Sequence, residues 1–169
     1  MRAAATGAAL LAIVFTGAIF GFFYAWVCST MWGLDAIDPR HAIAAMQGMN
    51  ASVRNGVFAP AFFGTPFVLA LAAGLAFLSR MRRAALLFAV AAALYLGFGL
   101  VLTLRVNVPM NEALARIAIP EDVDEARAIW SAYSGPWQTW NVVRTLASGL
   151  SLVLAALGLV ALARTANSA

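Results

Sequence analysis

The chain has 169 residues, of which 63% are hydrophobic and only 11% are charged. A soluble domain of this length does not need so many apolar side chains for its core, so the composition argues against a soluble protein. The formal net charge is +4 at pH 7. Because the arginines gather at the ends of long apolar runs, we interpret this charge as a sign of membrane topology. We expect no nucleic acid partner.

Four long apolar runs follow one another along the chain. Each exceeds the ~18 residues that mark a candidate transmembrane helix, and as a helix each crosses roughly 30 Å of hydrocarbon. Arg144, near the start of the last run, is the only charged residue inside them. We therefore predict an all-α fold, a four-transmembrane-helix bundle that forms a single membrane domain over residues 1–169. The predicted spans are 4–27, 57–79, 84–104 and 142–163, and the outer segments 28–56 and 105–141 are expected to contain short helices.

The arginines predict the orientation of the bundle. Five of them, and no acid, lie at the two ends and in the loop between the second and third runs: Arg2, Arg80, Arg82, Arg83 and Arg164. By the positive-inside rule these parts face the cytoplasm. The first run is longer than the core of a signal peptide and lacks a small-residue cleavage pattern, so we expect it to be retained. The sequence thus predicts an integral protein of the cell (inner) membrane with both termini cytoplasmic.

Small residues and prolines inside the runs predict how the helices pack. Glycines allow close approach of helices in lipid, and the candidates are Gly17, Gly21, Gly97 and Gly99. Pro60 and Pro66 lie in the outer half of the second run, where a proline is expected to kink the helix.

The first outer segment is predicted to contain a helix that begins at Asp38-Pro39, since Asp caps helices and Pro suits the first helical position. Gln47, Asn50 and Arg54 fall on one face of this helix. Such a polar face fits either the wall of a pocket or a solvated surface, and both interpretations stay open.

His41 lies in the first turn of the same predicted helix and is the only imidazole of the chain. Its ordinary pKa near 6.5 suits proton abstraction, which makes it a candidate base. A single histidine at the start of an outer helix also fits a surface position. A carboxylate of the second outer segment is the alternative base.

The second outer segment carries Asn107 and Asn111 on either side of Pro109, followed by the acidic stretch 120–125. Negative side chains favour the N-terminus of a helix, so we expect a helix to begin in that stretch. Gly135-Pro136 is expected to interrupt this helix, and the last span then begins at Pro136.

One stripe of the last span combines two aromatic rings, an amide and a guanidinium. Trp137, Trp140, Asn141 and Arg144 occupy positions i, i+3, i+4 and i+7. A charge two turns into a span is costly unless it snorkels to the surface or lies in a polar cavity. We favour a polar pocket around Arg144, with snorkelling as the alternative.

Several short motifs occur along the chain, namely Phe23-Tyr24-Ala25, Ala45-Met46-Gln47, Phe62-Phe63-Gly64, Asn107-Val108-Pro109-Met110-Asn111 and Trp137-x-x-Trp140-Asn141-x-x-Arg144. Together they resemble the DUF1772 or anthrone oxygenase-like family of small membrane proteins. The resemblance covers nearly the whole chain in the same order, and its Asn-x-Pro-x-Asn and Trp-Asn-x-x-Arg elements are specific only together.

The resemblance implies oxidation of an anthrone, or a similar hydrophobic polycyclic phenol, to a quinone by dioxygen without a bound metal or flavin. We expect catalytic residues that donate to an oxyanion or take a proton, namely Arg144, Asn141, Asn107 and His41. We expect substrate-binding residues that hold a flat ring system or its polar groups, namely Tyr24, Gln47, Arg54, Asn111, Trp137 and Trp140.

The chain has one histidine and one cysteine, so a metal site within one chain is not expected. No glycine-rich phosphate loop is present, and we expect no cofactor. The predicted partners are the lipid bilayer and a hydrophobic small molecule. Whether the chain also forms a homo-oligomer stays open. The alternative function is a non-enzymatic membrane protein that binds a lipid or quinone-like molecule in the same outer pocket.

Overall fold

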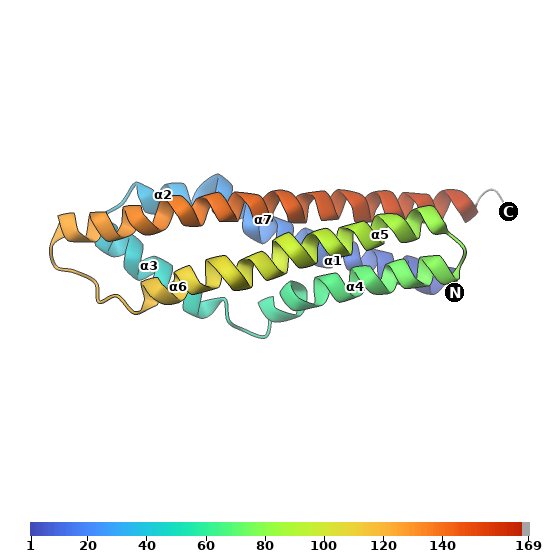
Figure 1. Ribbon diagram of the computed structural model, residues 1–169, viewed down its shortest axis with the longest axis horizontal. Coiled ribbons are helices and arrows are strands. Elements are labelled where there is room, and N and C mark those ends of the chain that lie inside the picture. Colours follow the sequence, from blue (N-terminus) through green and yellow to red (C-terminus); the bar gives the residue numbers. More distant parts are fainter. Residues whose placement is uncertain (167–169) are drawn as a thin grey trace.

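The structure is a computed structural model that describes residues 1–166, and every element in this range is helical (Figure 1). The α-helices are α1 (Arg2–Ala25), α2 (Met31–Asp35), α3 (Pro39–Ser52), α4 (Phe58–Leu78), α5 (Arg82–Leu94), α6 (Val108–Ala115) and α7 (Val123–Ala166). Three π-helical segments, η1 (Trp26–Thr30), η2 (Tyr95–Val101) and η3 (Thr103–Asn107), join some of them without a break in the backbone. The predicted all-α fold is confirmed.

Four helical stretches are long and apolar enough to cross a membrane, namely Arg2–Asp35, Phe58–Leu78, Arg82–Ala115 and Val123–Arg164. Helix α1 packs against α4 and α7, and α5 packs against the same two helices from the other side. The four helices therefore form a ring, with the start of α1, the end of α7 and the α4–α5 turn at the same end (Figure 1). The predicted four-helix bundle is confirmed.

The bundle core is built from small side chains with a few large ones between them. Gly64, Gly149 and Gly158 lie where a Cβ atom would come within 3.0 Å of a phenylalanine ring on a neighbouring helix. The four glycines expected from the sequence behave differently. A Cβ at Gly17 would lie 4.0 Å from Leu152 of α7, one at Gly99 would meet Tyr95 of its own helical stretch, and no atom lies within 4 Å of a Cβ at Gly21 or Gly97. Close helix contacts thus occur in this bundle, but mainly at other glycines than predicted.

An outer cap extends the bundle beyond its membrane part. Helices α2, α3, α6 and the first turns of α7 enclose a second apolar cluster around Met31, Ile43, Met46 and Trp130 (Figure 1). Only α3 is a separate helix, because the other parts of the cap continue the helices that cross the bundle. The predicted short helices of the outer segments are therefore largely extensions of the spans.

Helix α7 differs from the prediction because it runs without interruption through Gly135 and Pro136. A proline inside a helix removes one backbone hydrogen bond, and here the surrounding turns keep their helical course. The start of α7 is as predicted, since Asp122 accepts a hydrogen bond of 2.8 Å from the backbone N–H of Glu125. Because α7 is unbroken, the aromatic residues before Pro136 share one rigid element with Arg144.

The first turn of α3 is fixed by Asp38, as the sequence predicted. Its carboxylate accepts from the backbone N–H of Arg40 at 2.9 Å and from the guanidinium at 2.8 Å. These bonds lower the pKa of Asp38 to about 2. Arg40 also donates to the carbonyl oxygen of Glu121 at 3.1 Å, which joins α3 to the loop before α7.

The α4–α5 turn ends α4 with two backbone hydrogen bonds, Arg80 N to Phe77 O and Met81 N to Ala76 O, both at 2.9 Å. This pattern is a Schellman motif, in which glycine usually occupies the left-handed position. Here Arg80 occupies it with φ 61°. The turn therefore places an arginine where a smaller residue is more common.

Candidate functional site

A cavity of about 540 Å³ lies where the bundle meets the outer cap. It is bounded by α1, η1, α3, α4, η3, α6 and α7 and by the loop between α3 and α4. Aromatic side chains form much of its wall, namely Phe22, Phe23, Trp26, Phe58, Phe62, Phe63 and Trp137. Polar side chains in the wall are Asn50, Arg54, Asn55, Thr103, Asn111, Glu112 and Arg144.

Arg144 lies in the wall of this cavity and is only 4% exposed. Its guanidinium carbon is 4.3 Å from the centre of the Phe23 ring and 4.9 Å from that of Trp137. A cation near the faces of aromatic rings is attracted by their negative π clouds. The side chain is therefore enclosed by the protein and does not snorkel to bulk water.

Two polar side chains fix the plane of the Arg144 guanidinium. Its Nε donates to Asn141 Oδ1 at 2.8 Å, and its Nη1 donates to Thr103 Oγ1 at 3.4 Å. Asn141 is itself held, because its Nδ2 donates to the carbonyl oxygen of Phe23 at 3.2 Å. Within the described chain, Nη2 donates to no acceptor and no carboxylate forms an ion pair with Arg144. The site thus presents a fixed cation with unused donors.

A second hydrogen-bond network supports the wall beside Arg144. Asn111 Oδ1 accepts from Trp137 Nε1 and from the hydroxyl of Tyr133, each at 2.8 Å. Since an indole nitrogen only donates, the amide oxygen of Asn111 must face Trp137. The amide nitrogen then donates to Asn50 Oδ1 at 2.9 Å. This network connects α3, α6 and α7 and holds the Trp137 ring in place.

One carboxylate lies in the cavity wall. Glu112 Oε1 is 3.4 Å from Arg54 Nη2, and both side chains are about half exposed, at 45% and 59%. Exposure of this size indicates that the pair lies at the solvent-facing side of the cavity. An ion pair so exposed contributes little to stability. Its position beside an aromatic cavity makes Glu112 a candidate base.

The structure brings together four of the predicted site residues in the cavity wall: Arg54, Asn111, Trp137 and Arg144. Asn141 and Asn107 are buried behind this wall, and Asn107 Nδ2 donates to the carbonyl oxygen of Trp137 at 3.5 Å. Their geometry suits positioning, not contact with a ligand.

The other predicted site residues lie outside the cavity wall. His41 is exposed on α3, and Tyr24 and Trp140 are 50% and 40% exposed. Gln47 donates to the carbonyl oxygens of Leu114 and Ile117, at 2.9 and 3.0 Å, and so joins α3 to the end of α6. Gln47 falls on the same face as Asn50 and Arg54, which do line the cavity, but its side chain is bonded to the end of α6 instead.

Sequence reasoning did not single out Phe23 as a ring against Arg144, Thr103 as an acceptor, or Asn55. Asn55 Oδ1 accepts from the backbone N–H groups of Val57 and Phe58, at 2.8 and 3.0 Å, and its Nδ2 donates to Ser52 O at 2.7 Å. An asparagine shortly before a long apolar run is a recognisable capping signal.

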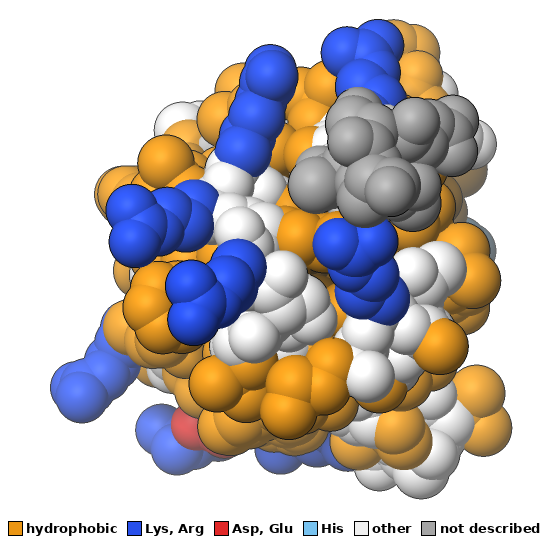
Figure 2. All heavy atoms as spheres, turned by 90° about the vertical axis from the view of Figure 1, so that its right-hand side faces the viewer, with side chains coloured by type: hydrophobic (Ala, Val, Ile, Leu, Met, Phe, Trp, Pro, Cys, Tyr) orange, Lys and Arg blue, Asp and Glu red, His pale blue; other side chains and the backbone are white. Residues whose placement is uncertain are grey.

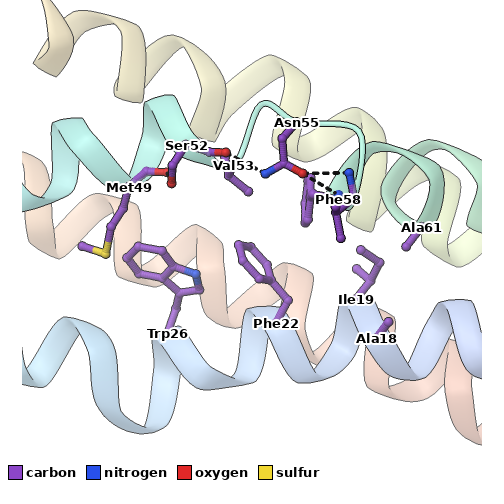
Figure 3. Close-up of a pocket in the computed structure, with 11 residues that line it drawn as sticks. Ala18, Ile19, Phe22, Trp26, Met49, Ser52, Val53, Asn55, Phe58 and Ala61 are labelled. Atoms are coloured by element: carbon purple, nitrogen blue, oxygen red, sulfur yellow. Dashed lines mark hydrogen bonds between the residues drawn. The ribbon is translucent and has the colours of Figure 1, made fainter.

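A second cavity, of about 480 Å³, adjoins the first between α1 and the start of α4. Figure 3 shows Ile19 and Phe22 of α1 on the side of Phe58 and the Asn55 turn, and Trp26 of η1 beside Met49. Phe22 and Phe58, with ring centres 4.8 Å apart, line both cavities. The two cavities are therefore separated by side chains and not by a helix.

The described residues contain no group of three or more His, Cys, Asp or Glu side chains that could hold a metal ion. The donors of the cavity wall are amides, guanidinium groups and a hydroxyl, which suit an oxygen-bearing organic ligand. The arrangement can enclose a flat hydrophobic molecule, place a fixed cation against one of its oxygens and present one carboxylate.

The comparison with protein families agrees with the motifs of the chain. The sequence model described as anthrone oxygenase matches residues 56–154, which include α4, α5, α6 and most of α7. The match covers more than half of the chain and contains Glu112, Trp137 and Arg144. No curated protein and no solved structure matches the chain. The chain therefore belongs to the anthrone oxygenase family.

Proposed function

We propose that this membrane protein oxidises a hydrophobic polycyclic phenol or anthrone with dioxygen, without a bound cofactor, in the cavity beside Arg144. The observation that carries the proposal is a buried guanidinium with free donors and no carboxylate partner in the described chain, placed in an aromatic cavity. Membership of the anthrone oxygenase family supports the same reaction.

The cavity suits a substrate of this class by size and by chemistry. Its volume of about 540 Å³ lies within the ~300–1,000 Å³ of ordinary small-molecule sites. Trp137 and the phenylalanines of the wall offer faces for a flat ring system. Arg144 offers Nη2 to an oxygen that becomes negative when the substrate loses a proton.

The first step is removal of a proton from the methylene carbon of the anthrone. Glu112 takes this proton, because it is the carboxylate in the cavity wall. The negative charge spreads to the carbonyl oxygen, where Arg144 stabilises it. Because this cation is already fixed by Asn141 and Thr103, little reorganisation is needed when the charge develops.

The electron-rich anion then reacts with dioxygen. One electron passes from the anion to dioxygen, and the two radicals combine to form a carbon–oxygen bond. The resulting peroxide anion regains the proton from Glu112. Loss of the second methylene proton and cleavage of the O–O bond release water and leave a carbonyl group. One dioxygen is consumed and one water is formed for each anthrone converted to a quinone.

The test is oxygen uptake by the purified full chain with an anthrone, under ¹⁸O₂. We expect one dioxygen per quinone and one ¹⁸O atom in the new carbonyl. Arg144→Ala should lower turnover by about 10²–10³-fold, as removal of an oxyanion donor does. Trp140→Ala is the matched control, because Trp140 lies one turn away on α7 and is 40% exposed.

Two results contradict the proposal. One is turnover of Arg144→Ala at the rate of the unchanged chain. The other is tight binding of the anthrone with no oxygen uptake above the protein-free background, which would support the alternative function of a non-enzymatic lipid or quinone binder.

A further inference from the structure

We propose that Gly99 is a positioning residue for the cation of the site: together with the ring of Tyr95, it holds a wide helical turn that brings the Thr103 hydroxyl to Arg144. Gly99 lies in η2 and does not line the cavity, so it acts through Thr103. The inference deepens the proposed function and rests on it for the role of Arg144.

The third span is π-helical over much of its outer half, and this changes which residues face inward. The N–H group of Leu102 donates to Gly97 O, five residues back instead of the four of an α-helix. Residues at intervals of four are buried through this stretch, namely Tyr95, Gly99, Thr103 and Asn107. In a regular α-helix the first and last of them would lie about 120° apart around the axis. The wider turns therefore keep Thr103 on the inner face, where it meets Arg144.

The ring of Tyr95 lies over Gly99 and is held at its far end by α4. A Cβ at Gly99 would lie 2.7 Å from Tyr95 Cδ2. Tyr95 is fully buried, and its hydroxyl donates to the carbonyl oxygen of Phe62 at 2.9 Å. That carbonyl lacks its usual helical donor, because the residue four positions later is Pro66, which has no N–H. A side chain at position 99 must therefore displace either this anchored ring or the backbone of η2.

The carbonyl group of Gly99 orients the hydroxyl that Arg144 uses. Thr103 Oγ1 donates its hydrogen to Gly99 O at 2.6 Å. A hydroxyl has one hydrogen and two lone pairs, so the oxygen is left to accept from Arg144 Nη1, at 3.4 Å. A shift of the Gly99 carbonyl would turn the hydroxyl or withdraw it from the guanidinium. Of its hydrogen bonds to described side chains, Arg144 would then keep the one from Nε to Asn141.

The test compares Gly99→Ala with Gly97→Ala, the matched control in the same π-helical segment. Nothing lies within 4 Å of a Cβ at Gly97, so this variant should oxidise an anthrone like the unchanged protein. In Gly99→Ala we expect kcat for oxygen uptake to fall roughly tenfold and KM to change less than about twofold, because an oxyanion donor is displaced while the aromatic wall remains. An unchanged kcat in Gly99→Ala would overturn the proposal.

A double-mutant cycle shows whether Gly99 acts through the hydroxyl. Thr103→Val keeps the shape of the side chain and should lower kcat by about the same factor as Gly99→Ala, whereas Thr103→Ser keeps the hydroxyl and should retain most of the rate. In the Thr103→Val background, Gly99→Ala should lower kcat no further. Two losses that multiply would show a general disturbance of the helix and overturn the proposal.

These substitutions leave the charges of the chain unchanged. The end of the bundle with the α4–α5 turn is rich in arginine side chains (Figure 2), and the substituted residues lie in the outer half of the third span, away from that end. We therefore expect every variant to insert in the same orientation. Circular dichroism and thermal unfolding in one neutral detergent verify that each variant is folded.

A ligand that cannot be oxidised separates this inference from the proposed function. The probe is 2-hydroxyanthraquinone, which is flat, has no methylene group and changes colour when its phenol loses a proton. We expect the unchanged protein and Gly97→Ala to bind more of the phenolate form than Gly99→Ala and Thr103→Val, because the fixed guanidinium stabilises an oxyanion. If this difference appears without oxygen uptake from an anthrone, the oxidation fails while the placement of Arg144 by Gly99 stands. Equal spectra in Gly97→Ala and Gly99→Ala would overturn the placement itself.

Discussion

Arg144 is a buried cation in a helix that crosses the bundle, and its surroundings explain how it is tolerated. Burial of an unpaired charge is costly. Two aromatic rings and two side-chain oxygens, Asn141 Oδ1 and Thr103 Oγ1, offset part of this cost. None of these neighbours carries a formal negative charge. A ligand that develops negative charge in the cavity is therefore stabilised more strongly than it would be beside a paired arginine.

Arg144→Lys is expected to fail although it keeps the positive charge. An ammonium group is a point charge and cannot donate to Asn141 and Thr103 from one plane while facing Phe23 and Trp137. We expect oxygen uptake with an anthrone to fall about 10²-fold or more, with an unchanged circular dichroism spectrum. If the lysine variant retains most of the turnover, the planar guanidinium is not what the site uses.

Glu112→Gln tests the proposed base with a side chain of nearly the same shape. The amide cannot accept the methylene proton, so we expect kcat to fall by about 10²–10⁴-fold, while the KM for the anthrone changes little. Glu112→Asp should recover part of the rate, because it keeps the carboxylate. The measurement is steady-state oxygen uptake. A glutamine variant with undiminished kcat would remove Glu112 from the reaction.

The site shows which residues a sequence can and cannot assign. The sequence grouped Trp137, Asn141 and Arg144 correctly, because their helical spacing places them on one face of one helix. Trp140 has the same spacing but lies at the edge of that face, where it is exposed. Phe23 belongs to α1 and meets Arg144 only through packing of α1 against α7. Contacts between distant helices follow from the tertiary structure, and helical spacing alone does not reveal them.

At the scale of helices, the bundle depends on a few close crossings. A Cβ atom at Gly158 would lie 2.7 Å from Phe88 Cζ on α5. Phe88 is fully buried in the packed core, so its ring cannot turn out into solvent to make room. The crossing of α5 and α7 therefore requires a residue without a side chain at this position.

Gly158→Ala is expected to destabilise the protein by about 1–3 kcal/mol, the usual cost of forcing an extra group into a packed core. Gly21→Ala is the control, since nothing lies within 4 Å of its added Cβ. That variant should be neutral or stabilise the helix by about 0.5–1 kcal/mol. Thermal unfolding in one neutral detergent measures both. Equal shifts of Tm in the two variants would show that this crossing is not tightly packed.

The helices also show the limits of predicting elements from apolar runs. The number and order of the spans follow from hydrophobicity, because the runs exceed the length needed to cross a bilayer. The ends of the helices do not follow from hydrophobicity. Helix α7, for example, continues through Pro136, where the sequence predicted a break. The π-helical segments η1, η2 and η3 had no recognisable sequence signal. They matter for the site, because η3 begins at Thr103, the acceptor of Arg144.

At the scale of the whole molecule, two adjoining cavities lie between the site and the side of the bundle. The larger cavity contains Arg144, and the smaller one begins at Ala18 and Ala61, between α1 and α4. Phe22 and Phe58 stand between them and come from different helices (Figure 3). We expect rotation of such side chains to join the cavities without separating the helices. For the proposed oxidation, this would give a substrate that dissolves in lipid a short path to the site.

Ala18→Phe should obstruct this path while leaving the site intact. Ala18 is exposed and lines only the smaller cavity, so we expect the KM for an anthrone supplied in lipid vesicles to rise roughly tenfold, with kcat unchanged. Val14→Phe is the matched control: Val14 lies one turn earlier on α1, is 64% exposed and lines neither cavity. Oxygen uptake across a range of anthrone concentrations measures both variants. An unchanged KM in Ala18→Phe, or the same rise of KM in Val14→Phe, would mean that the substrate reaches Arg144 by another route. The next route to test would then be the solvent-facing side of the cavity at Arg54 and Glu112.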